Sequence, residues 1–387
     1  MATVRFPVKP NVLTWAINSS GYDCDELRVS FPKLDSWLSG EEIPTFKQLG
    51  ALAKKMHIPL GYLVLNETPE EKIDLLNFRT INSDRLEKPS RELIDTIYDM
   101  QLKQDWMHDY RLSEEMDKLE FIGSLNSESK INISEATSNI RKKIEIELEW
   151  YNHFTKPDDA FSYLRNLLSK IGILVMVNGI VGSNTHRPLN LEEFRAFAMV
   201  DDYAPLIFIN GKDSKAGRLF SLCHELAHLW LGENSLYNDT CGEMNNKQYR
   251  SQKEVICNAI AAEMLVPNSM FKKHWQQTQS DLNLKINNLA RRFNVSNIVI
   301  ARRALDNAFI TDRDYYQINN QVEENVEKMK KSSGGNHYKT IAFTIDRAFF
   351  KSVNRSLKEG KTQFTEAYRL TGVKAKTFQH LESELGV

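Results

Sequence analysis

Apolar positions in the first third of the chain recur at the spacing expected of helices. Over residues 10–65 this spacing predicts a small module of short helices, most clearly over residues 45–56. Residues 66–85 are polar and indicate a connector. Between residues 89 and 151, apolar and charged positions again follow the helical period, which predicts a helical spacer packed on the next domain.

From about residue 160 the pattern combines helices with strands. Residues 160–171 predict a helix, and three apolar, partly β-branched runs predict strands at residues 173–177, 194–200 and 206–210. Apolar helices are then expected over residues 221–232 and 254–265. If the strand 206–210 lies at a sheet edge, a substrate segment could pair with it; a fully paired core strand is the alternative.

Beyond Pro267 the chain returns to helical patterns. Residues 289–305 predict two helices joined by a turn, and amphipathic helices are expected over residues 344–357 and 365–385. We therefore expect an α+β fold that is predominantly helical, with a small antiparallel sheet and helical domains on both sides. The expected domains are residues 1–66, 67–155, 156–312 and 313–387.

Composition limits the class of protein. The chain has 387 residues, 41% hydrophobic and 26% charged, as in an ordinary globular protein of two or three domains. No apolar run approaches the length of a membrane span, the first ten residues lack a signal-peptide core, and four cysteines are scattered without a framework. We therefore expect a cytoplasmic protein with no membrane contact. A net charge of −1 means that any nucleic-acid binding would need local basic patches.

The sequence SLCHELAHLWLG over residues 221–232 contains an H-E-x-x-H motif, formed by His224, Glu225 and His228. Histidines four positions apart lie on one face of a helix, where both imidazoles can hold one zinc ion. The surrounding residues are apolar, so the helix is expected to be buried, and buried polar groups are costly unless they have partners. The motif therefore predicts a zinc peptidase in which Glu225 is the general base.

A catalytic zinc needs a third protein ligand and an open position. Glu254, which lies with Asn258 on one face of the helix EVICNAIAAEML, is the preferred candidate. Glu263 is the rival carboxylate, but it lies on nearly the opposite helix face. Three cysteines are alternative soft ligands, although a cysteine-rich site would usually be closed and structural; they are Cys223, Cys241 and Cys257.

The combined motifs resemble the ImmA/IrrE family of metallo-endopeptidases. The resemblance covers roughly residues 160–310 and includes Ile-Asn at the end of a strand, the H-E-x-x-H helix and Glu-x-x-x-Asn-x-x-Ala-Ala-x-x-Leu-x-Pro from Glu254. It implies a zincin-like, gluzincin-like core with zinc held by His224, His228 and Glu254. It also makes three residues candidates for supporting the site or contacting substrate, namely Asn210, Arg218 and Asn258.

The N-terminal module resembles the helix-turn-helix domain of XRE-type phage repressors. Trp37-Leu38-Ser39-Gly40 followed by Pro44-Thr45 matches the end of a recognition helix. However, the expected reading helix offers only Lys33, and the segment before it has Arg28 as its one basic residue. DNA contact and protein contact through residues 10–65 therefore both remain open.

Residues 289–305 form a second segment that could contact DNA. They contain four arginines, yet no set of base-reading side chains is evident, so a docking module for protein explains them as well. The arginines are Arg291, Arg292, Arg302 and Arg303.

The family resemblance implies an endopeptidase acting on a regulatory protein. The expected partner is a helix-turn-helix repressor or antitoxin of a mobile element, stress response, toxin–antitoxin pair or phage-defence system. A DNA-binding regulator with a structural or sensory zinc core is the alternative function. The donor that stabilises the oxyanion stays open among four residues: His186, Tyr203, Tyr237 and Tyr249.

Overall fold

The computed structural model describes residues 4–71, 73, 75, 89–126, 130–238, 252–278, 280–328 and 337–386. The chain divides into two compact units. The first comprises Met1–Asp74 and Leu86–Ile97, and the second comprises Leu75–Arg85 and Tyr98–Val387. The H-E-x-x-H motif and Glu254 both lie in the second unit.

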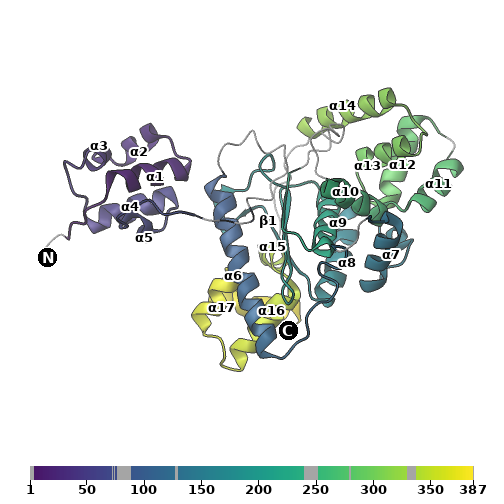
Figure 1. Ribbon diagram of the computed structural model, residues 1–387. Coiled ribbons are helices and arrows are strands. Elements are labelled where there is room, and N and C mark those ends of the chain that lie inside the picture. Colours follow the sequence, from purple (N-terminus) through teal and green to yellow (C-terminus); the bar gives the residue numbers. More distant parts are fainter. Residues whose placement is uncertain are drawn as a thin grey trace. The chain divides into compact units, whose positions relative to one another are not determined.

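The first unit is the predicted module of short helices, coloured purple in Figure 1. A capping box begins the fourth helix, because the Thr45 hydroxyl accepts from the Gln48 backbone while the Gln48 side chain accepts from the Thr45 backbone. Apolar side chains from all five helices, including Leu13, Trp37 and Leu49, form one core. The helices are α1 (Pro10–Ser20), α2 (Cys24–Ser30), α3 (Leu34–Leu38), α4 (Phe46–Met56) and α5 (Leu60–Leu63).

The second unit is built around a four-stranded sheet in the order β1-β5-β4-β6. The strands are β1 (Leu174–Asn178), β4 (Ala196–Met199), β5 (Leu206–Asn210) and β6 (Ser235–Tyr237), and a separate hairpin is formed by β2 (Ile180–Val181) and β3 (Asn184–Pro188). The expectation of an antiparallel sheet is corrected, because β1 runs parallel to β5 while the other pairs are antiparallel. The β2–β3 hairpin lies between β1 and β4 in sequence. β1 and β4 are not neighbours in the sheet, because β5 lies between them.

Of the two alternatives left open for residues 206–210, an edge strand and a fully paired core strand, the structure shows the core strand. β5 lies between β1 and β4 and all five of its residues are buried, so both of its backbone edges are already paired. Within the described residues, β6 pairs on one side only, with β4. The sheet edge nearest the H-E-x-x-H helix in sequence is therefore β6, a strand of three residues that the sequence pattern did not indicate.

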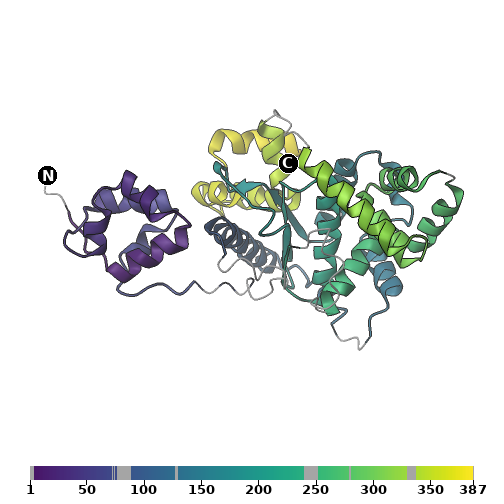
Figure 2. The same ribbon diagram turned by 90° about the horizontal axis from the view of Figure 1, so that it is seen from above.

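The two faces of the sheet are covered by different helices. Val175 and Ile207 join the core formed with α8 (Pro157–Lys170) and α9 (Lys215–Leu231). The alternating residues Met176 and Phe208 point to the other face, towards α6 (Arg91–Ser113) and the C-terminal helices. Figures 1 and 2 show α6 and the yellow C-terminal helices on one side of the strands and the teal and green helices on the other.

The other helices of the second unit occur in the order that the sequence predicted, but some are shorter than expected. Within the helical spacer expected over residues 89–151, one helix ends at Lys143. Two residues later Glu145 adopts a positive φ of 56° and turns the chain. No helix among the described residues has the length and apolar character needed to cross a membrane. The elements are α7 (Ile133–Lys143), the short 3-10 helix η3 (Trp150–His153), α10 (Gln252–Leu265), α11 (Asn268–Gln277), α12 (Leu282–Phe293), α13 (Asn297–Asp306) and α14 (Asp312–Lys328).

A buried aspartate attaches the C-terminal helices to the core. Asp346 begins α16 by accepting from the backbone of Ala348 and Phe349, and its carboxylate also accepts from the Ser169 hydroxyl and the Val175 backbone. A carboxylate with this many donors is stable when buried. The expected helix over residues 365–385 is broken at Gly372, which has a φ of 67°. The C-terminal helices are α15 (His337–Thr344), α16 (Arg347–Lys358), α17 (Phe364–Thr371) and α18 (Ala375–Leu385).

We predict that Gly232→Ala destabilises the second unit more than Gly360→Ala. Both glycines have φ near 70°, which costs an alanine about 1–2 kcal/mol. A Cβ on Gly232 would also lie 2.8 Å from the Gly123 Cα, whereas nothing lies within 4 Å of one on Gly360. The clash adds about 1–3 kcal/mol. Urea unfolding of the full chain measures the difference, and equal losses for the two variants would contradict this packing.

Candidate metal centre

Helix α9 sets the spacing of the two histidines. Its N-terminus is capped by the Ser214 hydroxyl, which accepts from the Gly217 backbone, and Gly232 ends it in the left-handed conformation. Because four residues make about one turn, His224 and His228 face the same side, with their Nε2 atoms 3.1 Å apart. Both imidazoles are buried. The predicted pair of facing histidines is present.

Helix α10 brings a carboxylate to the same point. Glu254 Oε2 lies 3.2 Å from His224 Nε2, and Oε1 lies 3.3 Å from His228 Nε2. In the part of the chain that the structure describes, these three residues form the group that could hold a metal ion, with ligand atoms within 4.8 Å of one another. The Glu254 side chain remains 15% exposed, so the group is reachable from one side.

The residues of this group change one another's pKa values. Burial alone would raise the pKa of Glu254, but the hydrogen bonds and charges of the two imidazoles outweigh it and hold the pKa well below its ordinary value. The pKa of His228 is raised, although burial opposes this, because the Cys257 thiol and Glu254 favour its charged form. The Glu254 carboxylate therefore favours the charged form of His228.

Asn258 orients the first imidazole. Its side-chain oxygen lies 3.1 Å from His224 Nδ1, so Nδ1 donates to it and the lone pair of Nε2 points at His228 and Glu254. The Tyr237 ring packs on His224 with 4.0 Å between ring centroids. Two nitrogens and a carboxylate that converge in this way match the donor set that zinc prefers. The residues therefore fit a divalent metal ion.

Glu225 lies beside the group without belonging to it. Its side chain is fully buried, and the Ser235 hydroxyl of β6 donates to Oε2. Oε1 has no hydrogen-bond partner among the residues that the structure describes. Burial raises the pKa of this carboxyl, against the opposing effect of the two neighbouring histidines. A partly satisfied buried carboxyl with a raised pKa is suited to exchange protons with a substrate.

The rival ligands lie elsewhere or are poorly suited. Glu263 pairs with Arg303 at 2.6 Å on α13, away from the histidines. Burial raises the pKa of Cys223 to about 12, so the thiol stays protonated. Cys257 contacts His228 as a neighbouring thiol, and burial raises its pKa as well. Cys241 lies outside the described residues.

Two of the further site candidates have structural partners. The Asn210 side chain is buried and donates to the Phe194 carbonyl at 3.1 Å, which fixes the end of β5. Arg218 donates to Asp158 of α8 at 2.9 Å, with its guanidinium over the Phe161 ring. Both residues position the elements around α9, and neither belongs to the group of metal-ligating residues.

Of the described candidates for the oxyanion donor, Tyr237 is the one whose ring packs on His224, a residue of the candidate metal group. Tyr203 packs against His108, and His186 is exposed on β3. Tyr249 lies outside the described residues.

Sequence reasoning missed Ser235, because a strand of three residues leaves no alternating pattern to detect.

Four of the six basic residues considered for DNA contact have acidic partners. On the N-terminal module, Arg28 pairs with Asp25 and Asp35, and Lys33 pairs with Glu42. In the second segment, Arg302 pairs with Asp306, and Arg303 with Glu263 as described above. These ion pairs reduce the positive charge that either segment presents.

We predict that Asn258→Ala weakens zinc binding about 10–100-fold, because the imidazole of His224 loses the partner that orients it. Competition with a chromogenic chelator measures the affinity. Asn287→Ala is the matched control, since the Asn287 side chain of α12 accepts an exposed hydrogen bond from Asn297 of α13 and does not belong to the metal group. Equal affinities for the two variants would rule out an orienting role of Asn258.

Two family models match the chain. Residues 345–384, which contain α16, α17 and most of α18, match a domain of unknown function, DUF8813. No curated protein matches the chain. Residues 169–305 match the Peptidase_M78 model, described as the IrrE N-terminal-like domain, and this segment contains His224, His228 and Glu254. The match supports a relationship of this domain to the ImmA/IrrE family of metallopeptidases.

Proposed function

We propose that the protein is a zinc-dependent endopeptidase of gluzincin type, with zinc held by His224, His228 and Glu254. The observation that carries the proposal is the convergence of three ligand atoms from α9 and α10 in a domain that matches a metallopeptidase family. The partial exposure of Glu254 leaves the approach to one side of the group open for a substrate.

In the proposed mechanism, Glu225 carries out the proton transfers of peptide hydrolysis. A bound zinc ion supplies Lewis-acid polarisation of the scissile carbonyl. Glu225 takes a proton from the attacking water and delivers it to the leaving amine. Its Oε1 atom has no partner and can accept the proton, while the Ser235 hydroxyl holds Oε2 in place. Asn258 keeps the His224 proton on Nδ1, away from the reacting groups.

The geometry supports an extended protein segment as the substrate. Strand β6 carries both Ser235, which contacts Glu225, and Tyr237, which packs on His224. Within the described residues only one side of β6 is paired, so we propose that the substrate backbone pairs along its other side. β6 thus takes the role that the sequence had suggested for residues 206–210.

We further propose that the substrate is a specific regulatory protein, namely a helix-turn-helix repressor or antitoxin of a mobile element, stress or phage-defence system. The support is the resemblance of residues 160–310 to ImmA/IrrE peptidases. The alternative of a DNA-binding regulator has less support, because Arg28 and Lys33 of the N-terminal module pair with carboxylates. Such a regulator would bind an operator and cleave nothing.

We predict that Glu225→Gln keeps zinc and lowers cleavage by about 10³-fold or more, because the amide cannot accept the proton of water. The assay follows cleavage of a helix-turn-helix protein encoded beside this gene, with zinc content measured in parallel. Glu147→Gln is the control, because Glu147 is exposed and outside the metal centre. Cleavage by Glu225→Gln at the wild-type rate would remove Glu225 from the mechanism.

A further inference from the structure

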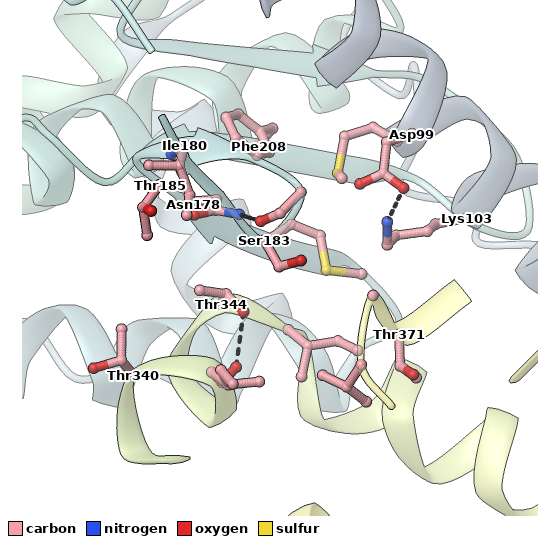
Figure 3. Close-up of a pocket in the computed structure, with 17 residues that line it drawn as sticks. Asp99, Lys103, Asn178, Ile180, Ser183, Thr185, Phe208, Thr340, Thr344 and Thr371 are labelled. Atoms are coloured by element: carbon pink, nitrogen blue, oxygen red, sulfur yellow. Dashed lines mark hydrogen bonds and ion pairs between the residues drawn. The ribbon is translucent and has the colours of Figure 1, made fainter. Parts of the chain in front are cut away.

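A pocket of about 220 Å³ lies on the face of the sheet opposite α9. Its walls come from α6, β1, the β2–β3 hairpin and β5 on one side, and from α15 and α17 on the other. Figure 3 shows the labelled residues of α6 and the strands facing Thr340, Thr344 and Thr371 of the C-terminal helices. The pocket is therefore separate from the metal centre.

Most of the pocket surface is apolar. Five buried or half-buried side chains from four parts of the fold supply it: Met100, Met176, Phe208, Ile345 and Val373. The volume is several times the roughly 30 Å³ that one water molecule occupies in the liquid, and it is below the roughly 300 Å³ at which pockets accept drug-sized ligands. The pocket is suited to a small organic molecule.

Two charged residues line the pocket, Asp99 and Lys103, and they pair across one turn of α6. The Lys103 side chain is only 8% exposed. An ammonium group has three hydrogen-bond donors, but the partner of Lys103 among the described residues is Asp99 alone. Burial lowers the pKa of Lys103 despite the opposing charge of Asp99, so this ammonium is incompletely compensated.

Three other polar side chains that line the pocket already donate hydrogen bonds within the protein. The Asn178 amide donates to the Gly182 carbonyl. The hydroxyls of Thr344 and Thr371 donate to carbonyls of their own helices. Lys103 is the cationic group in the pocket wall, and it can donate further hydrogen bonds to a ligand.

We propose that this pocket binds a small apolar carboxylic acid. The carboxylate accepts hydrogen bonds from the spare donors of Lys103, and the hydrocarbon part packs against Met176 and Phe208. Asp99 tolerates this second carboxylate because a third of its side chain is exposed to water, which screens the repulsion between them.

The pocket is lined by segments that match two different family models, together with α6. Met176 and Phe208 belong to the segment that matches the peptidase family, and Ile345 and Val373 belong to the segment that matches DUF8813. A ligand there contacts both segments at once and stabilises their association by mass action. The proposal concerns binding alone, so it stands or falls independently of the peptidase activity.

The first test titrates the full chain with phenylacetate and hexanoate by calorimetry, with phenylacetamide as the neutral analogue. We expect saturable binding of an acid with a Kd of about 1 mM or tighter. The neutral amide should bind about tenfold more weakly, because it offers Lys103 no charged acceptor. Absence of saturable binding by both acids, or equal binding of acid and amide, would overturn the proposal.

The second test compares Lys103→Met with Lys118→Met. Lys118 also pairs with an aspartate, Asp202, but it is exposed and does not line the pocket. We expect Lys103→Met to weaken acid binding at least about tenfold and Lys118→Met to leave it unchanged. Val373→Phe, which fills the pocket from its half-buried rim, should abolish binding and serves as a second variant if Lys103→Met fails to fold. Undiminished binding in either folded pocket variant would place the acid elsewhere.

Discussion

The contact between α9 and α10 is the constraint on which the rest of the site depends. Helix α9 alone provides two imidazoles at one helical turn, and only α10 can add Glu254 within 3.3 Å of both. A buried carboxylate is costly unless opposite charge or hydrogen-bond donors meet it. The cluster meets this condition by direct contact between the carboxylate and both imidazoles, and Asn258 and Tyr237 restrict the orientation of His224 from two further sides.

The surrounding fold maintains this contact from both faces of the sheet. Alternate residues of β1 and β5 pack on α8 and α9, while those between them face α6 and the C-terminal helices. Asp346 attaches the C-terminal helices to α8 and β1 through its buried hydrogen bonds. Helix α9, which carries the two histidines, and the pocket lined by Lys103 therefore lie on opposite faces of the same sheet and contain different chemistry.

Sequence periodicity predicted most of the long helices and the core strands. Motif spacing singled out His224, His228 and Glu254, which the structure brings together. Helix geometry indicated that Glu254 and Glu263 cannot both face one metal ion, and the family resemblance favoured Glu254. The pairing of Glu263 with Arg303 agrees with that preference. Periodicity failed for β6 and for the position of β5, since sheet order depends on contacts between segments distant in sequence. The contact of Ser235 with Glu225 and the pocket around Lys103 arise in the same way, from elements that only folding brings together.

The central claim is that one zinc ion is held between α9 and α10 by two imidazoles and one carboxylate. Anomalous diffraction at the zinc absorption edge, on crystals of protein purified without added chelator, tests it most directly. The account predicts one strong peak about 2.0–2.2 Å from Nε2 of His224, Nε2 of His228 and an oxygen of Glu254. A peak ligated by cysteine, or no zinc at this position in protein supplied with the metal, would contradict it.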